Sequence, residues 1–161
     1  MSNLASKVNK LKERFEIRGL TLSCAESCTG GLLSATISSQ PGISSFFLGA
    51  IVSYHRSFKN KILQVPLSLL DVVGEVSLPV ATKMAQGARA VTGSNWAVAI
   101  TGVAGPTGGT LDKPVGLVCF AIAGPGFSIS EIKKFDKNLM REEIQRLSVE
   151  YALDLLLKCT M

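Results

Sequence analysis

The sequence of 161 residues has few of the side chains that metal sites use. It has one histidine, and its four cysteines, Cys24, Cys28, Cys119 and Cys159, form no Cys-x-x-Cys pair. Structural zinc sites take four cysteine or histidine ligands at short spacings, so we expect no metal site. Isolated cysteines in an apolar chain of this size are typical of buried small side chains in a reducing compartment.

Aromatic residues and clustered charges are also scarce. Aromatic residues make up 6% of the chain, and its lysines and arginines are scattered although the net charge is +5. Nucleic-acid-binding domains gather their basic residues on one face, so we expect no nucleic-acid partner, although an anionic small ligand fits the charge. No apolar run approaches the roughly 20 residues of a membrane helix, and the N-terminus does not resemble a signal peptide. We expect a soluble, cytoplasmic protein with no membrane partner.

The remaining composition predicts one well-packed domain over residues 1–161. Hydrophobic residues make up 47% and charged residues 18% of the chain, which argues against disorder. Helical and strand patterns alternate, and a hairpin turn at residues 124–126 reverses the chain. This order predicts an α/β fold, a three-layer α/β/α domain with a mixed, mostly parallel sheet. Helices are expected before Gly19 (with Leu4, Val8, Leu11 and Phe15 at helical spacing), to about 39, over 59–63 (ended by Val65-Pro66), after the N-cap Ser77 and over 140–159. Strands are expected over 20–25, 46–53 (a buried strand), 96–101, 115–123 and 127–135.

Residues 25–31, Ala-Glu-Ser-Cys-Thr-Gly-Gly, join a predicted strand to a predicted helix through a tight turn. Gly30 and Gly31 allow backbone to approach a ligand closely. The first turn of a helix has free N–H groups, so Ser27, Thr29 and these amides converge where an anion or a developing oxyanion could lie. The alternative is an ordinary helix capped by Ser or Thr.

Three predicted strands end in polar residues that a sheet would bring to one edge. They end at Ser27, Tyr54 and Thr101, and ligands of such sheets bind beside the carboxyl ends of the strands. A serine at a sharp strand-to-helix turn is a candidate nucleophile, so Ser27 is the candidate here.

The base for this serine is expected to be Lys59, with Tyr54, because the sole histidine has no obvious carboxylate partner. A lysine that is partly desolvated in a cleft can be neutral enough to take a proton. The alternatives are that Ser27 only caps a helix and that Lys59 is a solvated surface residue.

A glycine-rich loop follows Thr101 and contains Gly102, Gly105, Gly108 and Gly109. Such a loop offers backbone N–H groups to a phosphate. Its spacing matches neither Gly-x-x-x-x-Gly-Lys-Ser/Thr nor Gly-x-Gly-x-x-Gly, so no nucleoside triphosphate or dinucleotide site is predicted. The alternative is a long turn.

Arg141 lies in the first turn of the last predicted helix, where a positive charge opposes the helix dipole. Its spacing places it on the same inward face as Ser148. A positive charge in that position indicates an anionic ligand. The alternative is an ion pair with Glu142, Glu143 or Asp136.

Several motifs resemble the CinA C-terminal domain family, in the same order along nearly the whole chain. Residues 25–31 are similar to its Ala-Glu-Ser-Cys-Thr-Gly-Gly motif, and residues 74–77, Gly-Glu-Val-Ser, to its Gly-Ala-Val-Ser segment. Residues 101–109 and 113–116 resemble its Thr-Gly-Ile-Ala-Gly-Pro-x-Gly-Gly and Lys-Pro-Val-Gly block.

The resemblance implies a function, because stand-alone members of this family are nicotinamide mononucleotide amidohydrolases. They convert nicotinamide mononucleotide and water to nicotinate mononucleotide and ammonia, and they tend to self-associate, so a homo-oligomer without a cofactor is expected. Ser27 then corresponds to the nucleophile, and Lys59 and Tyr54 to the base region. The expected substrate-binding residues are Glu26, Thr29, Gly30, Gly31, Thr101, Gly102, Gly105, Gly108, Gly109 and Arg141.

The sequence departs from the family pattern beside the expected site. Arg56 replaces the asparagine of the family's Tyr-Ser-Asn-x-x-Lys, and its Gly-Asp-Arg reads Leu139-Met140-Arg141 here. Gln64 replaces the glycine of its Leu-Gly-Val. The changes at Arg56, Leu139 and Met140 favour a second interpretation: an inactive member, related to competence or damage response, that binds a nucleotide or a partner protein.

Overall fold

The computed structural model describes residues 3–161 as twelve elements around one five-stranded sheet. Their chain order is α1 (Asn3–Arg18), β1 (Leu22–Glu26), α2 (Leu32–Ser38), the short 3-10 helix η1 (Ile43–Ser45), β2 (Phe47–Val52), α3 (Arg56–Lys61), α4 (Leu67–Val73), α5 (Leu78–Thr92), β3 (Trp96–Gly102), β4 (Leu117–Gly124), β5 (Phe127–Lys134) and α6 (Arg141–Cys159).

The sheet has the order β2-β1-β3-β4-β5. Strand β1 pairs in parallel with β2 and β3, whereas β4 pairs antiparallel with β3 and β5. Four of the five strands therefore run in one direction and only β4 opposes them. The predicted mixed, mostly parallel sheet is confirmed, and so is the hairpin of β4 and β5.

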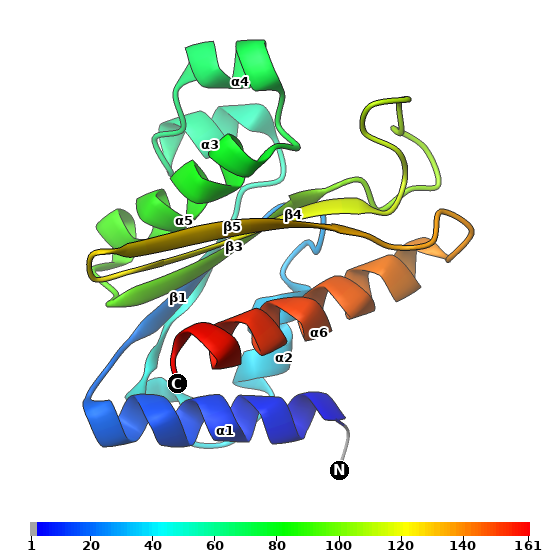
Figure 1. Ribbon diagram of the computed structural model, residues 1–161. Helices are drawn as coiled ribbons and strands as arrows, with labels where there is room; N and C mark the ends of the chain where they lie inside the picture. Colours follow the sequence, from blue (N-terminus) through cyan, green and yellow to red (C-terminus); the bar gives the residue numbers. More distant parts are fainter. Residues whose placement is uncertain (1–2) are drawn as a thin grey trace.

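Helices cover both faces of this sheet, as predicted. Helices α1, α2 and α6 lie on one face, and α3, α4 and α5 lie on the other (Figure 1). The alternation along β3 shows why both faces are apolar: Val98 and Ile100 belong to the core beneath α1 and α6, whereas Ala97 and Ala99 contact the core beneath α5. Each layer of helices thus packs against every second side chain of β3.

Two elements differ from the prediction. Strand β2 was expected to be buried, but it is one of the two edge strands, and Leu48 and Val52 are 49% and 42% exposed. An apolar run cannot tell a central strand from an edge strand, because neighbours decide its burial. Helix α4 was not predicted; Pro66, which was taken to end α3, is instead the residue that begins α4.

Residues 3–161 contain no helix that is both long enough and apolar enough to span a membrane.

Candidate active site

The carboxyl ends of β1, β2 and β3 meet at one edge of the sheet, and backbone hydrogen bonds fix the residues that follow them. Ser27 donates its N–H to the carbonyl of Ile100 in β3 (3.0 Å), and Ser53 donates to the carbonyl of Glu26 at the end of β1 (2.8 Å). Thr101 is the penultimate residue of β3 and is 1% exposed. These hydrogen bonds place Ser27 beside the chain that leaves β2.

Helix α3 brings Lys59 over this edge. His55 caps the start of α3 by accepting the N–H of Ser57 at Nδ1 (3.2 Å), and Lys59 then points inward with 1% of its side chain exposed. Its Nζ lies 2.9 Å from Oγ of Ser27. The structure thus joins the expected nucleophile and base in a buried serine–lysine pair, and Lys59 is not a solvated surface residue.

Three further oxygen atoms surround the amine of Lys59. Its Nζ lies 2.9 Å from the carbonyl of Ser53, 3.3 Å from that of Tyr54 and 3.3 Å from Oε1 of Glu75. Burial lowers the pKa of Lys59 from its ordinary value, and the charge of Glu75 offsets part of this effect by raising it. Lys59 is therefore easier to deprotonate than a surface lysine, as a general base must be.

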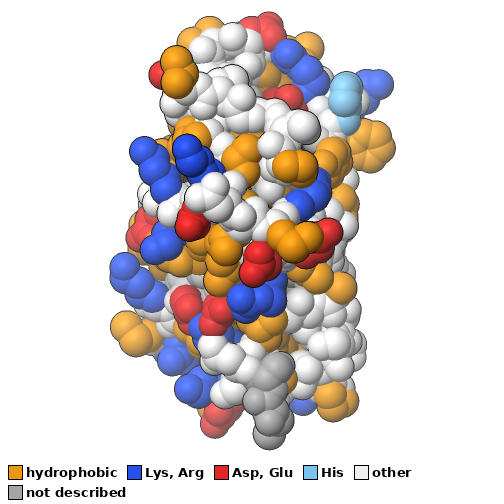
Figure 2. Space-filling model, turned by 90° about the vertical axis from the view of Figure 1, so that its right-hand side faces the viewer, with side chains coloured by type: hydrophobic (Ala, Val, Ile, Leu, Met, Phe, Trp, Pro, Cys, Tyr) orange, Lys and Arg blue, Asp and Glu red, His pale blue; other side chains and the backbone are white. Residues whose placement is uncertain are grey.

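A cavity of about 160 Å³ opens beside this pair. It is lined by Ser27, Cys28, Tyr54, Lys59, Glu75, Val76, Thr101 and Gly102. Sites for drug-sized ligands are usually about 300 Å³ or more, so this cavity is large enough for only a small part of such a ligand. On the side of the molecule that Figure 2 shows, acidic and basic side chains are interspersed.

The start of α2 differs from the expected anion site, because Glu26 occupies it. The buried carboxylate of Glu26 accepts hydrogen bonds from the N–H groups of Leu33 (2.8 Å) and Ser34 (3.0 Å) and from the hydroxyl of Thr29 (2.8 Å). The amide of Gly30 donates to the carbonyl of Ser27 (3.0 Å). These groups are thus engaged within the protein.

The α2 turn also shows that Ser27 does not cap the helix. The residue that begins α2 is Gly31, with a φ of 102° and no side-chain cap. Glu26, Thr29, Gly30 and Gly31 do not line the cavity, whereas Ser27 does.

Arg141 connects two segments at the mouth of the cavity. Its guanidinium donates to the carbonyl of Gly105 (2.7 Å) and to the phenol oxygen of Tyr54 (2.8 Å). Tyr54 is 57% exposed, and only its backbone carbonyl touches Lys59. The phenol therefore lies with Arg141 and not with Lys59. Within residues 3–161 no ion pair of Arg141 with an acidic side chain occurs.

The glycine-rich loop contributes to the site with its first part only. Gly102 lines the cavity, and Gly105 accepts the hydrogen bond of Arg141. Gly108 and Gly109 are exposed in the part of the loop that projects beyond the sheet (Figure 1). The hydroxyl of Thr101 donates to the backbone carbonyl of Glu75 (3.0 Å), so it positions the cavity wall.

Sequence reasoning missed Glu75 as a site residue. One feature of the sequence could have revealed it: Glu75 is an acidic residue in the Gly-Glu-Val-Ser segment, at the position where the family motif Gly-Ala-Val-Ser has alanine. The three residues that differ from the family pattern, and that favoured an inactive protein, lie away from the cavity. Arg56 pairs with Asp71. Leu139 packs against the core, and Met140 is 67% exposed at the start of α6. None of these three lines the cavity.

The sequence and the fold both identify the relatives of this chain. Residues 4–160 match the sequence profile described as the CinA C-terminal domain. The chain belongs to this family. Its members include two CinA-like proteins: one from Prochlorococcus marinus, 50% identical over 85% of this chain, and one from Parasynechococcus marenigrum, 45% identical over 94% of it. This chain spans about a third of the length of these relatives, 32% and 36%.

CinA proteins of known structure share the whole fold. The crystal structure of the competence/damage inducible protein CihA from Agrobacterium tumefaciens matches with a TM-score of 0.96 at 33% identity, covering 100% of this chain and 98% of that one. A CinA superfamily protein from Escherichia coli matches with a TM-score of 0.93 at 32% identity, covering 98% and 90%. The predicted resemblance to the CinA family is thus confirmed.

Proposed function

We propose that this CinA-family protein is an amidohydrolase that converts nicotinamide mononucleotide and water to nicotinate mononucleotide and ammonia. The observation that carries the proposal is the buried amine of Lys59, 2.9 Å from the hydroxyl of Ser27 at the wall of a small cavity. A neutral amine in hydrogen-bond contact with a serine is the arrangement that activates it as a nucleophile. The family resemblance supplies the substrate.

The reaction proceeds through an ester of Ser27. Lys59 takes the hydroxyl proton as Oγ attacks the carboxamide carbon, and the N–H of Cys28, which follows the nucleophile directly, stabilises the oxyanion. Lys59 returns the proton to the leaving nitrogen, and ammonia departs. A water molecule, deprotonated by Lys59, then cleaves the ester and releases the carboxylate. No cofactor takes part in these steps.

The size of the cavity sets how the substrate binds. The pyridine ring and its carboxamide occupy the cavity, and the ribose and phosphate extend past Tyr54 towards Arg141 and Gly105 at its mouth. Arg141 then offers the phosphate a charge-assisted hydrogen bond, in exchange for one of its present contacts. Glu26 and Thr29 act indirectly, by holding the turn that carries Ser27. Self-association is part of the proposal, and the exposed apolar edge strand β2 supports it.

Product analysis tests this proposal. Purified protein is incubated with nicotinamide mononucleotide, and ammonia and nicotinate mononucleotide are quantified by a coupled assay and by chromatography. We expect equal amounts of both products and no release of free nicotinamide. Absence of both products, with the fold intact by circular dichroism, would overturn the proposal.

A further inference from the structure

Glu75 lies in a short link between α4 and α5 that is anchored on both sides. The hydroxyl of Thr101 donates to its backbone carbonyl (3.0 Å), and the hydroxyl of Ser77 donates to the carbonyl of Gly74 (3.1 Å). Lys113 donates to the carbonyl of Val73, just before the link. The backbone beneath Glu75 is therefore fixed, and its side chain enters the cavity wall from a defined position.

The carboxylate of Glu75 faces the amine of Lys59. Oε1 lies 3.3 Å from Nζ, and Glu75 is the only acid in ion-pair contact with Lys59 among residues 3–161. The two side chains differ in environment, because Lys59 is 1% and Glu75 43% exposed. Glu75 thus stays hydrated at the mouth of the cavity while one of its oxygens reaches the buried amine.

We propose that Glu75 is a positioning residue that completes a Ser27–Lys59–Glu75 relay: it holds the amine against the serine and stabilises the ammonium that forms when Lys59 takes the serine proton. Its role in turnover rests on the proposed function. The reactivity of Ser27 can be measured without that function.

The number of hydrogens on the amine of Lys59 explains why it needs the carboxylate of Glu75. A neutral amine has two N–H groups and one lone pair, so it can donate to Ser53 and Glu75 and keep its lone pair for the hydroxyl of Ser27. After the transfer, Lys59 carries a positive charge and three hydrogens. A buried charge without a counter-charge is costly, and Glu75 supplies that counter-charge.

The other ionisable groups near Lys59 do not replace Glu75. Burial raises the pKa of the Cys28 thiol to about 12, so this group stays neutral at ordinary pH. The phenol of Tyr54 is held by Arg141, and only the tyrosine carbonyl reaches Nζ. Arg141 is a cation, and its guanidinium donates to Gly105 and Tyr54, so it supplies no negative charge to Lys59. Loss of the Glu75 charge therefore lowers the pKa of Lys59 and removes the partner of its ammonium form.

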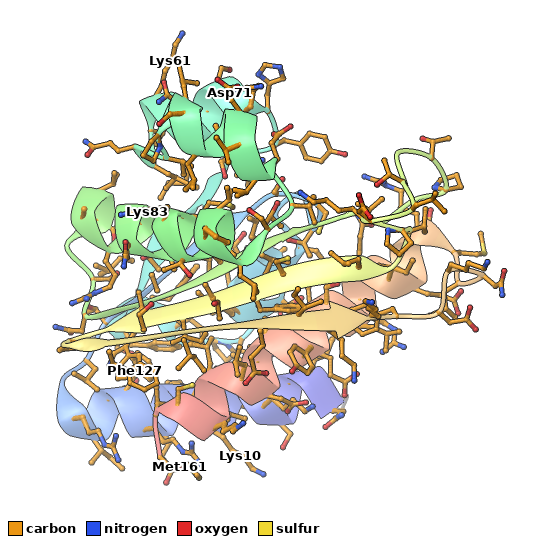
Figure 3. All side chains as sticks on the ribbon, turned by 45° about the horizontal axis from the view of Figure 1, so that its top comes forward. Lys10, Lys61, Asp71, Lys83, Phe127 and Met161 are labelled. Atoms are coloured by element: carbon orange, nitrogen blue, oxygen red, sulfur yellow. The ribbon has the colours of Figure 1, made fainter. Side chains whose placement is uncertain are left out.

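The rate at which phenylmethylsulfonyl fluoride modifies Ser27 tests the relay across a pH range. Wild type, Glu75→Gln and Asp71→Asn are compared, because Asp71 is an acid that pairs with Arg56 in the outer part of the helical layer (Figure 3) and does not touch Lys59. We expect Glu75→Gln to move the acidic limb of the profile to lower pH and to lower the plateau roughly tenfold. Asp71→Asn is expected to overlay wild type.

Two results would overturn the inference. One is a Glu75→Gln profile with the wild-type limb and plateau. The other, which applies even if the sulfonyl fluoride does not react, is an unchanged titration midpoint of the Lys59 side chain in heteronuclear NMR spectra of Glu75→Gln. A shifted midpoint in a protein that leaves nicotinamide mononucleotide intact would support the relay and contradict only the proposed substrate.

Discussion

Lys59 is the residue on which the proposed chemistry depends, because it is a basic side chain with 1% of its surface exposed. Lys59 belongs to α3, and its amine contacts oxygen atoms of Ser27 and Ser53, which follow β1 and β2, and of Glu75 in the α4–α5 link. A lysine in this environment gives up its proton at a lower pH than a solvated one, since burial lowers its pKa.

Replacement of Lys59 by methionine keeps the apolar stem and removes proton transfer. We expect kcat to fall by roughly 10²–10⁴-fold, the usual contribution of a general base. Lys61→Met, on the exposed side of the same helix, is the matched control and should retain wild-type kcat. Normal turnover by Lys59→Met would assign the base to another group.

If the proposed activity is correct, the pH profile of the wild-type protein follows from the same pKa. Lys59 acts as a base only when neutral, so kcat/KM should rise with pH and level off above the pKa of Lys59. Because burial lowers that pKa, the plateau should begin at a lower pH than an exposed lysine would give. Initial rates of ammonia release across pH test this expectation. A rate that falls as pH rises through this range would contradict it.

Arg56 is the family departure nearest to the base, yet the structure turns it outward. It pairs with Asp71 in α4 and is absent from the cavity wall. Arg56→Asn, which restores the family residue, should therefore leave kcat and KM for nicotinamide mononucleotide within about twofold of wild type, since surface changes of this kind contribute little. A change of tenfold or more would show that Arg56 reaches the substrate.

Individual residues differ in how far the sequence reveals them. Ser27 and Lys59 could be proposed because strand ends and turn residues are visible in the pattern. The role of Glu26 in binding the start of α2 could not be predicted. Its carboxylate accepts hydrogen bonds from amides seven and eight residues further along the chain, and that contact depends on the angle between β1 and α2. Glu75 lies 16 residues from Lys59 with an unpredicted helix between them, so no local spacing joins them.

At the scale of elements, the link between α3 and α4 contains a strained residue. Gln64 has a φ of 58°, and the family resemblance places glycine there. A left-handed backbone costs a residue with a Cβ roughly 1–2 kcal/mol, whereas glycine loses roughly 0.5–1 kcal/mol of entropy on folding. Gln64 is thus a compromise that the fold tolerates in a short connection.

Gln64→Gly should raise the free energy of unfolding by roughly 0.5–1 kcal/mol, the difference of those two effects. Chemical denaturation measures it. Gln86→Gly, inside α5, is the control and should lower the free energy by about 1 kcal/mol, since glycine is a poor helix former. Destabilisation by both changes would show that the conformation of Gln64 is not strained.

Elements were predictable where their own residues determine them. Helix α1 shows buried Val8, Leu11 and Phe15 at helical spacing and ends before Gly19, as expected. The serine cap of α5 is also confirmed, because Ser77 accepts the N–H of Val80. The burial of β2 and the existence of α4 depend on which elements pack beside them in space. Local sequence patterns carry no information about those neighbours.

At the scale of the whole molecule, the layered fold explains why the site lies where it does. Three parallel strands end at the same edge, and α3 and the α4–α5 link close over it from one helical layer while α6 reaches it from the other (Figure 1). The order of elements was enough to predict this edge. The size of the cavity was not, because it depends on how closely side chains from five segments pack.

We propose that Ser27 is a nucleophile that Lys59 activates, and one rate comparison decides whether it is. Ammonia release from nicotinamide mononucleotide is measured for wild type, Ser27→Ala and Ser34→Ala, a serine of α2 outside the cavity. We predict a loss of several orders of magnitude for Ser27→Ala with a nearly unchanged Tm, and wild-type rates for Ser34→Ala. If Ser27→Ala keeps most of its activity, water attacks the amide directly and the claim is wrong.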